Sequence, residues 1–278
     1  MKKKVFLTRT LHDFALKELR KKYQVEIHSG QIPIPQTKLR SKIKDIDGLI
    51  CFPYDTINKE IIKEGRNLKV ISTYSVGFDH IDTGYSKKKK IRVGYTPEVL
   101  TDATADMAFS LLLDIARRTT EGDRIIRDAK WKKIYGAFDY VGIDLQGKTV
   151  GILGLGRIGS TLAKRAKAFD MKVIYHNRKR VVKSKEKSLD AKYVSFEKLI
   201  TESDFISIHV PHTKETDGLF NMKIFKKMKK SSFLINTSRG KVVNEKELAI
   251  ALKKRIISGA GLDVFEREPT KKNHPLVK

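Results

Sequence analysis

The chain has little cysteine and no long apolar run, and each shortage argues against a class of protein. Cys51 is the single cysteine in 278 residues, so an internal disulfide is excluded. The apolar sequence around Cys51 predicts a buried, unreactive thiol rather than a nucleophile. No stretch of about 18 or more uncharged apolar residues indicates a membrane span, and the lysine-rich start with its short apolar run does not indicate a signal peptide. We therefore expect a cytoplasmic protein.

Acidic residues are also scarce, because 58 Lys and Arg face 32 Asp and Glu, a net charge of +26. Such a field attracts nucleic acid or small anions. The lysines are scattered over amphipathic segments, without interleaved aromatics or a known nucleic-acid-binding motif. His209 and His212 straddle Pro211, and no cysteine or carboxylate cluster completes a metal site. We expect a small anionic partner, no nucleic acid, no membrane and no metal.

Short β-branched runs alternate with helical patterns along the chain. The predicted strands are residues 5–8, 25–28, 49–52, 70–73 and 92–95, followed by 149–153, 172–175, 205–210, 233–236 and 258–262. Such alternation implies parallel sheets covered by helices on both faces. A long apolar helix, from about Thr101 to Arg118, separates the two series. The sequence thus predicts an α/β fold with two domains, residues 1–98 and 99–278.

A glycine-rich segment directly after the strand at 149–153 predicts a dinucleotide site. It reads Gly154-Leu155-Gly156-Arg157-Ile158-Gly159 and opens a helix, which is the context that a G-x-G-x-x-G motif requires. Gly154 permits the tight turn, and Gly156 lets the backbone approach a pyrophosphate at the helix N-terminus. Gly159 allows close packing of helix and strand. We expect this loop, including Arg157 and Ile158, to bind a nicotinamide dinucleotide.

The strand at 172–175 lacks the acidic residue that usually binds the adenosine ribose of NAD. It runs instead into His176-Asn177-Arg178-Lys179-Arg180. Guanidinium groups at this position pair well with the 2′-phosphate of NADP. We therefore predict Asn177, Arg178 and Arg180 as cofactor ligands and favour NADP(H). NAD(H) remains open, and an ordinary solvated basic loop is the alternative interpretation.

Four further segments resemble the D-isomer-specific 2-hydroxyacid dehydrogenases, in particular the glyoxylate/hydroxypyruvate reductases. They are the residues at 75–82, 96–103, 236–240 and 261–269, which read SVGFDHID, TPEVLTDA, NTSRG and GLDVFEREP. The resemblance spans essentially the whole chain, in order. It implies a flavodoxin-like substrate domain and a doubly wound Rossmann domain. It also implies NAD(P)H-dependent reduction of a small 2-oxo acid to the D-2-hydroxy acid, in a homodimer.

The resemblance assigns substrate and catalytic roles to four residues. Arg239 would bind the substrate carboxylate with its fork of donors and polarise the carbonyl. The backbone amides of Val76 and Gly77 would hold the same carboxylate. Glu268 would pair with the catalytic histidine and keep it protonated. Taken without the resemblance, these residues also fit a surface arginine, a strand-to-helix turn and a plain loop glutamate.

The resemblance also implies further cofactor contacts, with Asp263 near the nicotinamide amide. These residues are Thr104, Pro211, Thr237, Ser238 and Asp263. Each taken singly also fits a routine cap, turn or loop. Together with the glycine loop and the basic segment after the next strand, they define the predicted cofactor site.

In the family the proton donor is a histidine in a Pro-His segment beyond the position matched by Glu268 and Pro269. This sequence ends at Lys278, before that segment and before the return of the chain to the substrate domain. His274 lies too close to Glu268 to serve as the donor. Two interpretations therefore stay open beside the active reductase. One is a truncated or degenerate relative that binds nucleotide without turnover, and the other is a corepressor-like interaction protein.

Overall fold

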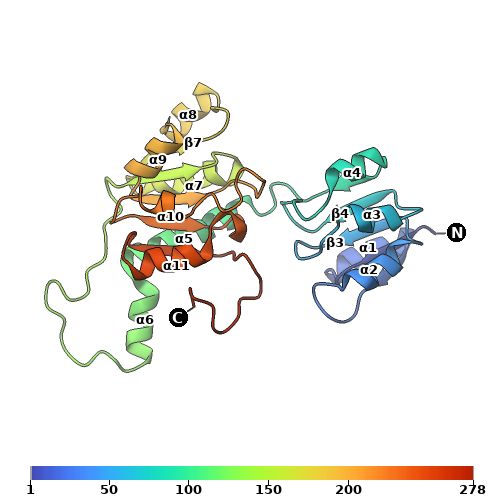
Figure 1. Cartoon of the computed structure of the whole chain (residues 1–278), viewed down its shortest axis with the longest axis horizontal. Coiled ribbons are helices and arrows are strands. Elements are labelled where there is room, and N and C mark those ends of the chain that lie inside the picture. The colour runs from blue at the N-terminus through green and yellow to red at the C-terminus, as the bar shows by residue number, and fades with distance from the viewer. Residues whose placement is uncertain (1, 278) are drawn as a thin grey trace. The chain divides into compact units, whose positions relative to one another are not determined.

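The computed structural model describes residues 2–277, and the chain divides into two compact units, Met1–Leu100 and Thr101–Lys278. Each unit is built around one parallel sheet with helices on its faces (Figure 1). The chain therefore has the two parallel-sheet α/β domains that the sequence predicts. No helix in the described part of the chain is long and apolar enough to cross a membrane.

The first unit has the strand order β2-β1-β3-β4-β5, which is the flavodoxin-like doubly wound order. Its strands are β1 (Lys4–Leu7), β2 (Gln24–Ile27), β3 (Gly48–Cys51), β4 (Val70–Thr73) and β5 (Arg92–Gly94). Its helices are α1 (Asp13–Lys22), α2 (Gln36–Ile43), α3 (Lys59–Glu64) and α4 (Thr83–Lys88). Asn58 and Asp82 cap α3 and α4 with their side chains, so polar residues fix where these helices begin.

The second unit has the strand order β11-β10-β9-β6-β7-β8, all parallel. Its strands are β6 (Thr149–Leu153), β7 (Lys172–His176), β8 (Ala191–Tyr193), β9 (Phe205–Ile208), β10 (Phe233–Asn236) and β11 (Gly259–Leu262). Its helices are α5 (Thr101–Arg117), α6 (Thr119–Arg127), α7 (Arg157–Ala168), α8 (Lys183–Leu189), α9 (Phe196–Glu202), α10 (Met222–Phe225) and α11 (Glu245–Lys253). This is the Rossmann order, and the winding direction reverses between β6 and β9.

The long helix expected between the two strand series is α5, and it packs against the second unit. Ala105, Ala108, Phe109, Leu112 and Ala116 are buried along one face. Small residues at helical spacing let α5 lie close to α7, which also presents Ala163 and Ala166 to the core. Beyond Arg117 the chain turns at Arg118, which has left-handed backbone angles, and continues as α6.

The strands of the second sheet differ from the predicted ones mainly at β8 and β9. The sequence did not predict β8, which has three residues and pairs only with β7. Ala191 is buried in β8 while Lys192 is exposed, so the strand is too short and too mixed to show a pattern. The predicted strand at 205–210 ends at Ile208, because His209 begins the loop at the edge of the sheet.

Candidate functional site: the carboxyl edges of the two sheets

Five predicted cofactor positions lie at or soon after the ends of five neighbouring strands of the second unit. Gly154 follows β6, Asn177 follows β7, Pro211 comes soon after β9, Thr237 follows β10 and Asp263 follows β11. In a parallel sheet the carboxyl ends of all strands meet at one edge. The fold therefore brings these positions to one edge, with the reversal between β6 and β9 among them, where open α/β sheets bind ligands.

The glycine loop has no room for side chains at Gly154 and Gly159 but has open space at Gly156. Gly154 has φ +101°, and an added Cβ there would lie 2.7 Å from the carbonyl oxygen of His209. A Cβ on Gly159 would lie 2.2 Å from the carbonyl oxygen of Gly154. Gly156 precedes α7, and a Cβ there would meet nothing within 4 Å. The space beside Gly156, directly before the start of α7, is thus open, which suits a pyrophosphate at the helix N-terminus.

Asn177 holds the glycine loop from the end of the next strand. The backbone N–H of Leu155 donates to Asn177 Oδ1 at 2.7 Å, and the N–H of Gly154 donates to the carbonyl of His176 at 3.0 Å. Lys185 on α8 donates to the carbonyl of Leu155 at 3.4 Å. The side chain predicted to contact the cofactor therefore positions the loop itself.

Arg178 and Arg180 have different environments. Arg180 donates from Nε and Nη2 to the two carboxylate oxygens of Glu186, each at 2.8 Å. The hydroxyl of Tyr175 also donates to Glu186, and these two donors lower the pKa of Glu186 to about 2. Arg178 is exposed. Its charge lowers the pKa of Glu215, after the stronger effect of a hydrogen bond from Thr213.

The loop after β9 contains two histidines, of which His209 is neutral and His212 is paired with a carboxylate. Burial lowers the pKa of His209 to about 4, so its ring is neutral, and Nε2 lies 2.8 Å from the hydroxyl of Ser207. His212 pairs with Asp217 at 2.7 Å. The carbonyl of Pro211 accepts a hydrogen bond from Thr216 at 2.7 Å. The loop is thus held by its own side chains.

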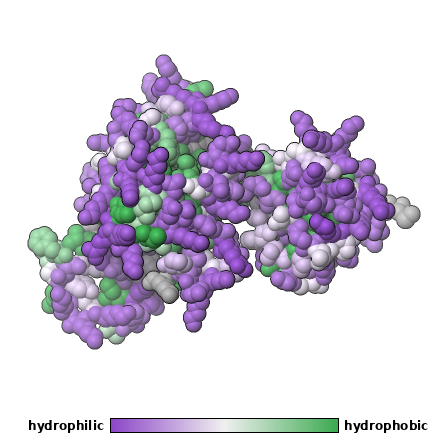
Figure 2. All heavy atoms as spheres, viewed as in Figure 1, coloured by the Kyte–Doolittle hydropathy of each residue, from purple (hydrophilic) through white to green (hydrophobic). Residues whose placement is uncertain are grey.

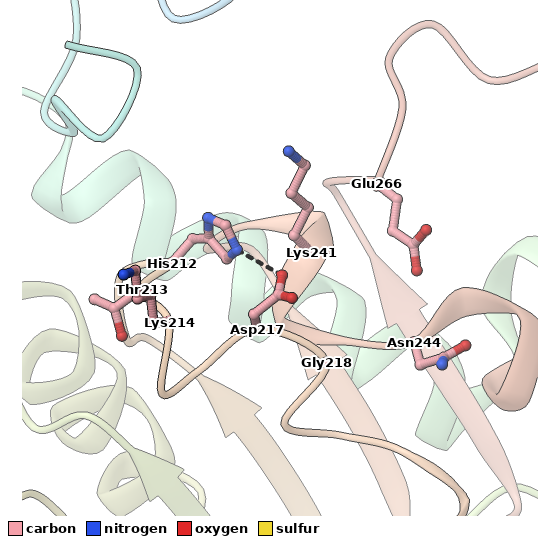
Figure 3. Close-up of a pocket in the computed structure, with 8 residues that line it drawn as sticks. All are labelled: His212, Thr213, Lys214, Asp217, Gly218, Lys241, Asn244 and Glu266. Atoms are coloured by element: carbon pink, nitrogen blue, oxygen red, sulfur yellow. Dashed lines mark hydrogen bonds and ion pairs between the residues drawn. The ribbon is translucent and has the colours of Figure 1, made fainter. Parts of the chain in front are cut away.

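A hollow of about 630 Å³ lies beside this loop (Figure 3). It is lined by His212, Thr213, Lys214, Asp217, Gly218, Lys241, Asn244 and Glu266. The close-up shows His212 turned toward Asp217 and away from the ends of Lys241 and Glu266. Sequence reasoning assigned no role to this hollow. Within residues 2–277, no group of three His, Cys, Asp or Glu side chains could hold a metal ion.

The turn after β10 is built by a buried asparagine that sequence reasoning did not single out. Asn236 donates from Nδ2 to the carbonyl of Arg239 at 2.9 Å, and its Oδ1 accepts from the N–H and hydroxyl of Ser238, each at 3.0 Å. Arg239 is half-buried and donates to the carbonyl of Ser238 at 2.8 Å. The buried hydroxyl of Thr237 has no hydrogen-bond partner within residues 2–277.

A buried polar atom without a partner is rare and calls for an explanation. At the end of β10 a bound ligand supplies one, because Thr237 lies on the same sheet edge as the glycine loop. Thr104 is half-buried in the first turn of α5, and Asp263 is exposed, with its N–H bonded to the carbonyl of Asn236 at 3.0 Å. The open Gly156 and the orphaned Thr237 hydroxyl fit a dinucleotide.

Glu268 and His274 are not paired with each other. Glu268 is exposed and accepts a hydrogen bond from the N–H of Phe265 at 2.9 Å. His274 Nε2 lies 2.8 Å from the carboxylate of Glu245, which is buried at the start of α11. The backbone N–H groups of Glu245 and Glu266 each donate to the other residue's carboxylate. His274 therefore belongs to a separate polar cluster.

Val76 and Gly77 follow β4, at the carboxyl edge of the first unit's sheet. Within residues 2–277, neither backbone N–H donates to a protein acceptor. Phe78 and Tyr95 are partly exposed beside them and meet edge to face at 5.2 Å.

Cys51 is buried, and burial together with the charge of Asp55 raises its pKa to about 12, so the thiol is unreactive.

The doubly wound sheet, its glycine loop and the partnerless Thr237 hydroxyl define a dinucleotide-binding domain joined to a second α/β domain. Comparison with known proteins makes this specific. Residues 109–278 match the family described as D-isomer specific 2-hydroxyacid dehydrogenase, NAD binding domain. The glyoxylate reductase of Thermococcus litoralis is 47% identical over 272 residues, which cover 97% of this chain and 82% of that protein.

Two solved structures of related enzymes are similar along almost the whole chain. The D-lactate dehydrogenase of Aquifex aeolicus, complexed with NAD and lactic acid, has a TM-score of 0.84 at 33% identity and covers 95% of this chain and 77% of its own. An acyclic imino acid reductase in complex with NADPH and D-Arg has a TM-score of 0.87 at 29% identity. The match covers 99% of this chain and 86% of that chain. The chain belongs to the D-isomer-specific 2-hydroxyacid dehydrogenases and is an oxidoreductase of the CH–OH class.

Proposed function

We propose that the chain uses NADPH to reduce a small 2-oxo acid of the glyoxylate type to the D-2-hydroxy acid. The observation that carries the proposal is that two residues lie close together in sequence after β10. One is Thr237, whose buried hydroxyl has no hydrogen-bond partner within residues 2–277, and the other is the half-buried Arg239. Both lie on the sheet edge that also carries the open glycine loop. The glyoxylate reductase of Thermococcus litoralis, 47% identical, supports this substrate class.

The residues that would hold the cofactor lie in the second unit. The amides that begin α7, with Gly156, Arg157 and Ile158, would bind the pyrophosphate, because a helix N-terminus favours negative charge. Thr104, Thr237, Ser238 and Asp263 would hold the nicotinamide half, and Pro211 would line the adenosine half. When bound, the nicotinamide supplies a hydride for the carbonyl carbon of the substrate.

The choice of NADPH rests on the end of β7. The similar enzymes include one complexed with NAD and one complexed with NADPH, so similarity leaves the choice open. No carboxylate follows β7 to bind a ribose hydroxyl, and Arg178 is exposed there. Arg180 uses two donors on Glu186, which leaves Arg178 as the better phosphate ligand.

The substrate carboxylate would be bound by two kinds of donor. Arg239 presents a planar fork that matches a carboxylate and can polarise the adjacent carbonyl. The amides of Val76 and Gly77, which have no protein acceptor within residues 2–277, would be the donors that the first unit offers to a carboxylate. Glu268 would be the carboxylate partner of the histidine that gives a proton to the carbonyl oxygen as the hydride arrives. Within residues 2–277 it accepts a hydrogen bond from the N–H of Phe265 and is not paired with His274.

A second candidate function is nucleotide binding without turnover. The observation that favours it is the pairing of His274 with Glu245 at 2.8 Å, because His274 is the histidine nearest to Glu268 in the sequence. Two measurements separate the candidates: NADPH binding by fluorescence, and NADPH oxidation with glyoxylate by absorbance. Binding with turnover supports the reductase, binding alone supports the second candidate, and absence of binding contradicts both.

We also propose that two copies of the chain form a dimer through α6 and the segment that follows it. No residue of α6 is buried, and Ile126, Trp131, Ile134, Phe138 and Val141 are more than half exposed. Figure 2 shows apolar residues gathered on this part of the second unit. Residues 119–145 contain five acidic and five basic residues in a chain of net charge +26. Two basic copies can therefore meet here without strong repulsion.

A further inference from the structure

A line of hydrogen-bonded side chains ends on the backbone of the Val76–Gly77 turn. His80 Nε2 lies 2.9 Å from the hydroxyl oxygen of Thr73, which lies 2.9 Å from the hydroxyl oxygen of Ser75. The hydroxyl of Ser75 donates to the carbonyl of Gly77 at 2.5 Å. Thr73 and Ser75 are buried. The first unit therefore contains a continuous line of polar side chains at the carboxyl edge of its sheet.

The direction of this line is fixed by its last member. A carbonyl can only accept, so the single proton of the Ser75 hydroxyl is used on Gly77. Ser75 must then accept from Thr73, and Thr73 must accept from His80. His80 therefore carries a proton on Nε2. The nearby Cys51 thiol, 3.9 Å from the same nitrogen, is neutral because burial raises its pKa, so no thiolate competes for that proton.

The line fixes a peptide plane that glycine would otherwise leave free to rotate. Because the peptide is planar and trans, holding the Gly77 carbonyl inward directs the N–H of Phe78 the opposite way. Within residues 2–277, the N–H groups of Val76, Gly77 and Phe78 donate to no protein acceptor. The turn thus presents consecutive free donors beside a carbonyl that is tied back, which is a backbone site for an anion.

We propose that His80, Thr73 and Ser75 are positioning residues that hold the Val76–Gly77 backbone in the conformation that binds the substrate carboxylate. This inference rests on the proposed reductase function. It assigns to the three side chains a part of substrate affinity, although none of them needs to touch the substrate. The hydrogen bonds would also polarise one another along the line, so that loss of any member weakens the hold on Gly77.

Other contacts keep the surrounding backbone folded when one hydroxyl is removed. The N–H of Thr96 donates to the carbonyl of Ser75 at 3.0 Å, and the N–H of Ile57 donates to the carbonyl of His80 at 2.8 Å. Asp82 caps α4 directly after the turn. A single hydroxyl deletion is therefore expected to loosen the Gly77 peptide without unfolding the unit.

The first test compares Thr73→Val and Ser75→Ala with the wild type in steady-state kinetics. Each variant should raise KM for glyoxylate by about threefold to tenfold, the worth of one hydrogen bond, with kcat and KM for NADPH unchanged. Thr73→Ser keeps the hydroxyl and should restore the wild-type KM. Ser72→Ala, one residue earlier in β4 and half-buried, is the matched control and should change nothing. Unchanged KM in both deletion variants would overturn the proposal.

A second test does not depend on turnover. Nitrogen-15 NMR of the imidazoles should show His80 with its proton on Nε2, and titration with oxamate, an unreactive 2-oxo-acid analogue, should shift the Gly77 amide. Oxamate binding should be about threefold to tenfold weaker in Ser75→Ala. A proton confined to Nδ1, or a Gly77 amide that oxamate does not shift, overturns the inference. A wild type that binds oxamate at Gly77 but turns over no 2-oxo acid contradicts the proposed function instead.

Discussion

At the residue scale, two arginines that lie two positions apart in sequence differ in what they can bind. Both side chains are exposed near the end of β7, but Arg180 is held by Glu186 through two hydrogen bonds. A forked ion pair of this kind holds a guanidinium in one orientation. The preference for NADPH should therefore depend on Arg178 far more than on Arg180.

Arg178→Asp tests this assignment directly. We expect the Kd for NADPH to rise about tenfold to hundredfold, because a charged hydrogen bond is lost and a repulsive carboxylate is added. The Kd for NADH should change by less than about threefold. Lys179→Asp makes the same charge change one residue away and is the control. Equal weakening of both cofactors by Arg178→Asp would contradict a phosphate contact.

Glu186 offers a pH-dependent test of the same region. Its pKa falls from 4.5 to about 2 because Arg180, and then Tyr175, donate hydrogen bonds to it. The pKa is lower in the folded chain, so the stabilisation is present above pH 4.5 and is lost as the pH falls toward 2. Glu186→Gln should lower Tm at neutral pH, and its difference from the wild type should shrink across that interval in thermal scans.

The control for this measurement is Glu197→Gln, which removes an exposed ion pair with Lys227. Exposed pairs contribute little, so this variant should keep nearly the wild-type Tm at every pH. A Tm difference for Glu186→Gln that stays constant down to pH 2 would show that the carboxylate charge is not what stabilises the loop.

At the element scale, α6 and the segment after it are the part of the second unit with the most exposed apolar side chains. Ile134 is 91% exposed and Phe138 is 92% exposed, while Trp131, Tyr135 and Tyr140 stack on one another along the segment. Burying one such side chain is worth about 1.5–3 kcal/mol. A few of them buried against a second copy would hold a dimer together.

The double variant Ile134→Asp, Phe138→Asp should convert that dimer into a monomer. Light scattering after size exclusion would measure the change in mass at micromolar concentration. Phe14→Asp is the matched control, because Phe14 is 73% exposed on α1 of the first unit, outside the proposed interface. A dimer that survives the double variant would place the interface elsewhere, and a monomeric wild type would contradict the proposal itself.

The sequence predicted the elements with strong periodicity and missed those that depend on three-dimensional pairing. The strands and their parallel sheets follow from alternating β-branched runs, and the glycine loop follows from its motif. No sequence pattern shows that Glu186, six residues along, would engage Arg180, or that Asn236 would build the turn around Thr237 and Ser238. Such contacts are decided by which loops meet at the sheet edge. The line from His80 to Gly77 was missed for the same reason.

At the scale of the whole molecule, the residues assigned to the cofactor lie in one unit with its own core. The two large apolar clusters of the second unit surround both faces of its sheet. Of the residues assigned to the substrate, Arg239 lies in this second unit, whereas Val76 and Gly77 lie in the first, where a separate cluster forms the core. Loss of the first unit should therefore weaken binding of the 2-oxo acid without weakening binding of NADPH.

Residues 101–278 expressed alone should bind NADPH with a Kd within about threefold of the whole chain, a difference of less than about 1 kcal/mol. Oxamate binding should be lost, because the Val76–Gly77 turn is absent. Calorimetric titration of both ligands measures the two effects together. Retention of oxamate affinity by the second unit alone would remove the turn from the substrate site.

The open space at Gly156 separates what the fold requires from what a ligand requires. Added side chains at Gly154 or Gly159 would collide with backbone, but a Cβ at Gly156 meets nothing within 4 Å. The native chain therefore has room there that its own packing does not need. A bulky residue at Gly156 should abolish cofactor binding in a protein that keeps its fold, abundance and partners. Such a variant is what a clean loss-of-function allele requires.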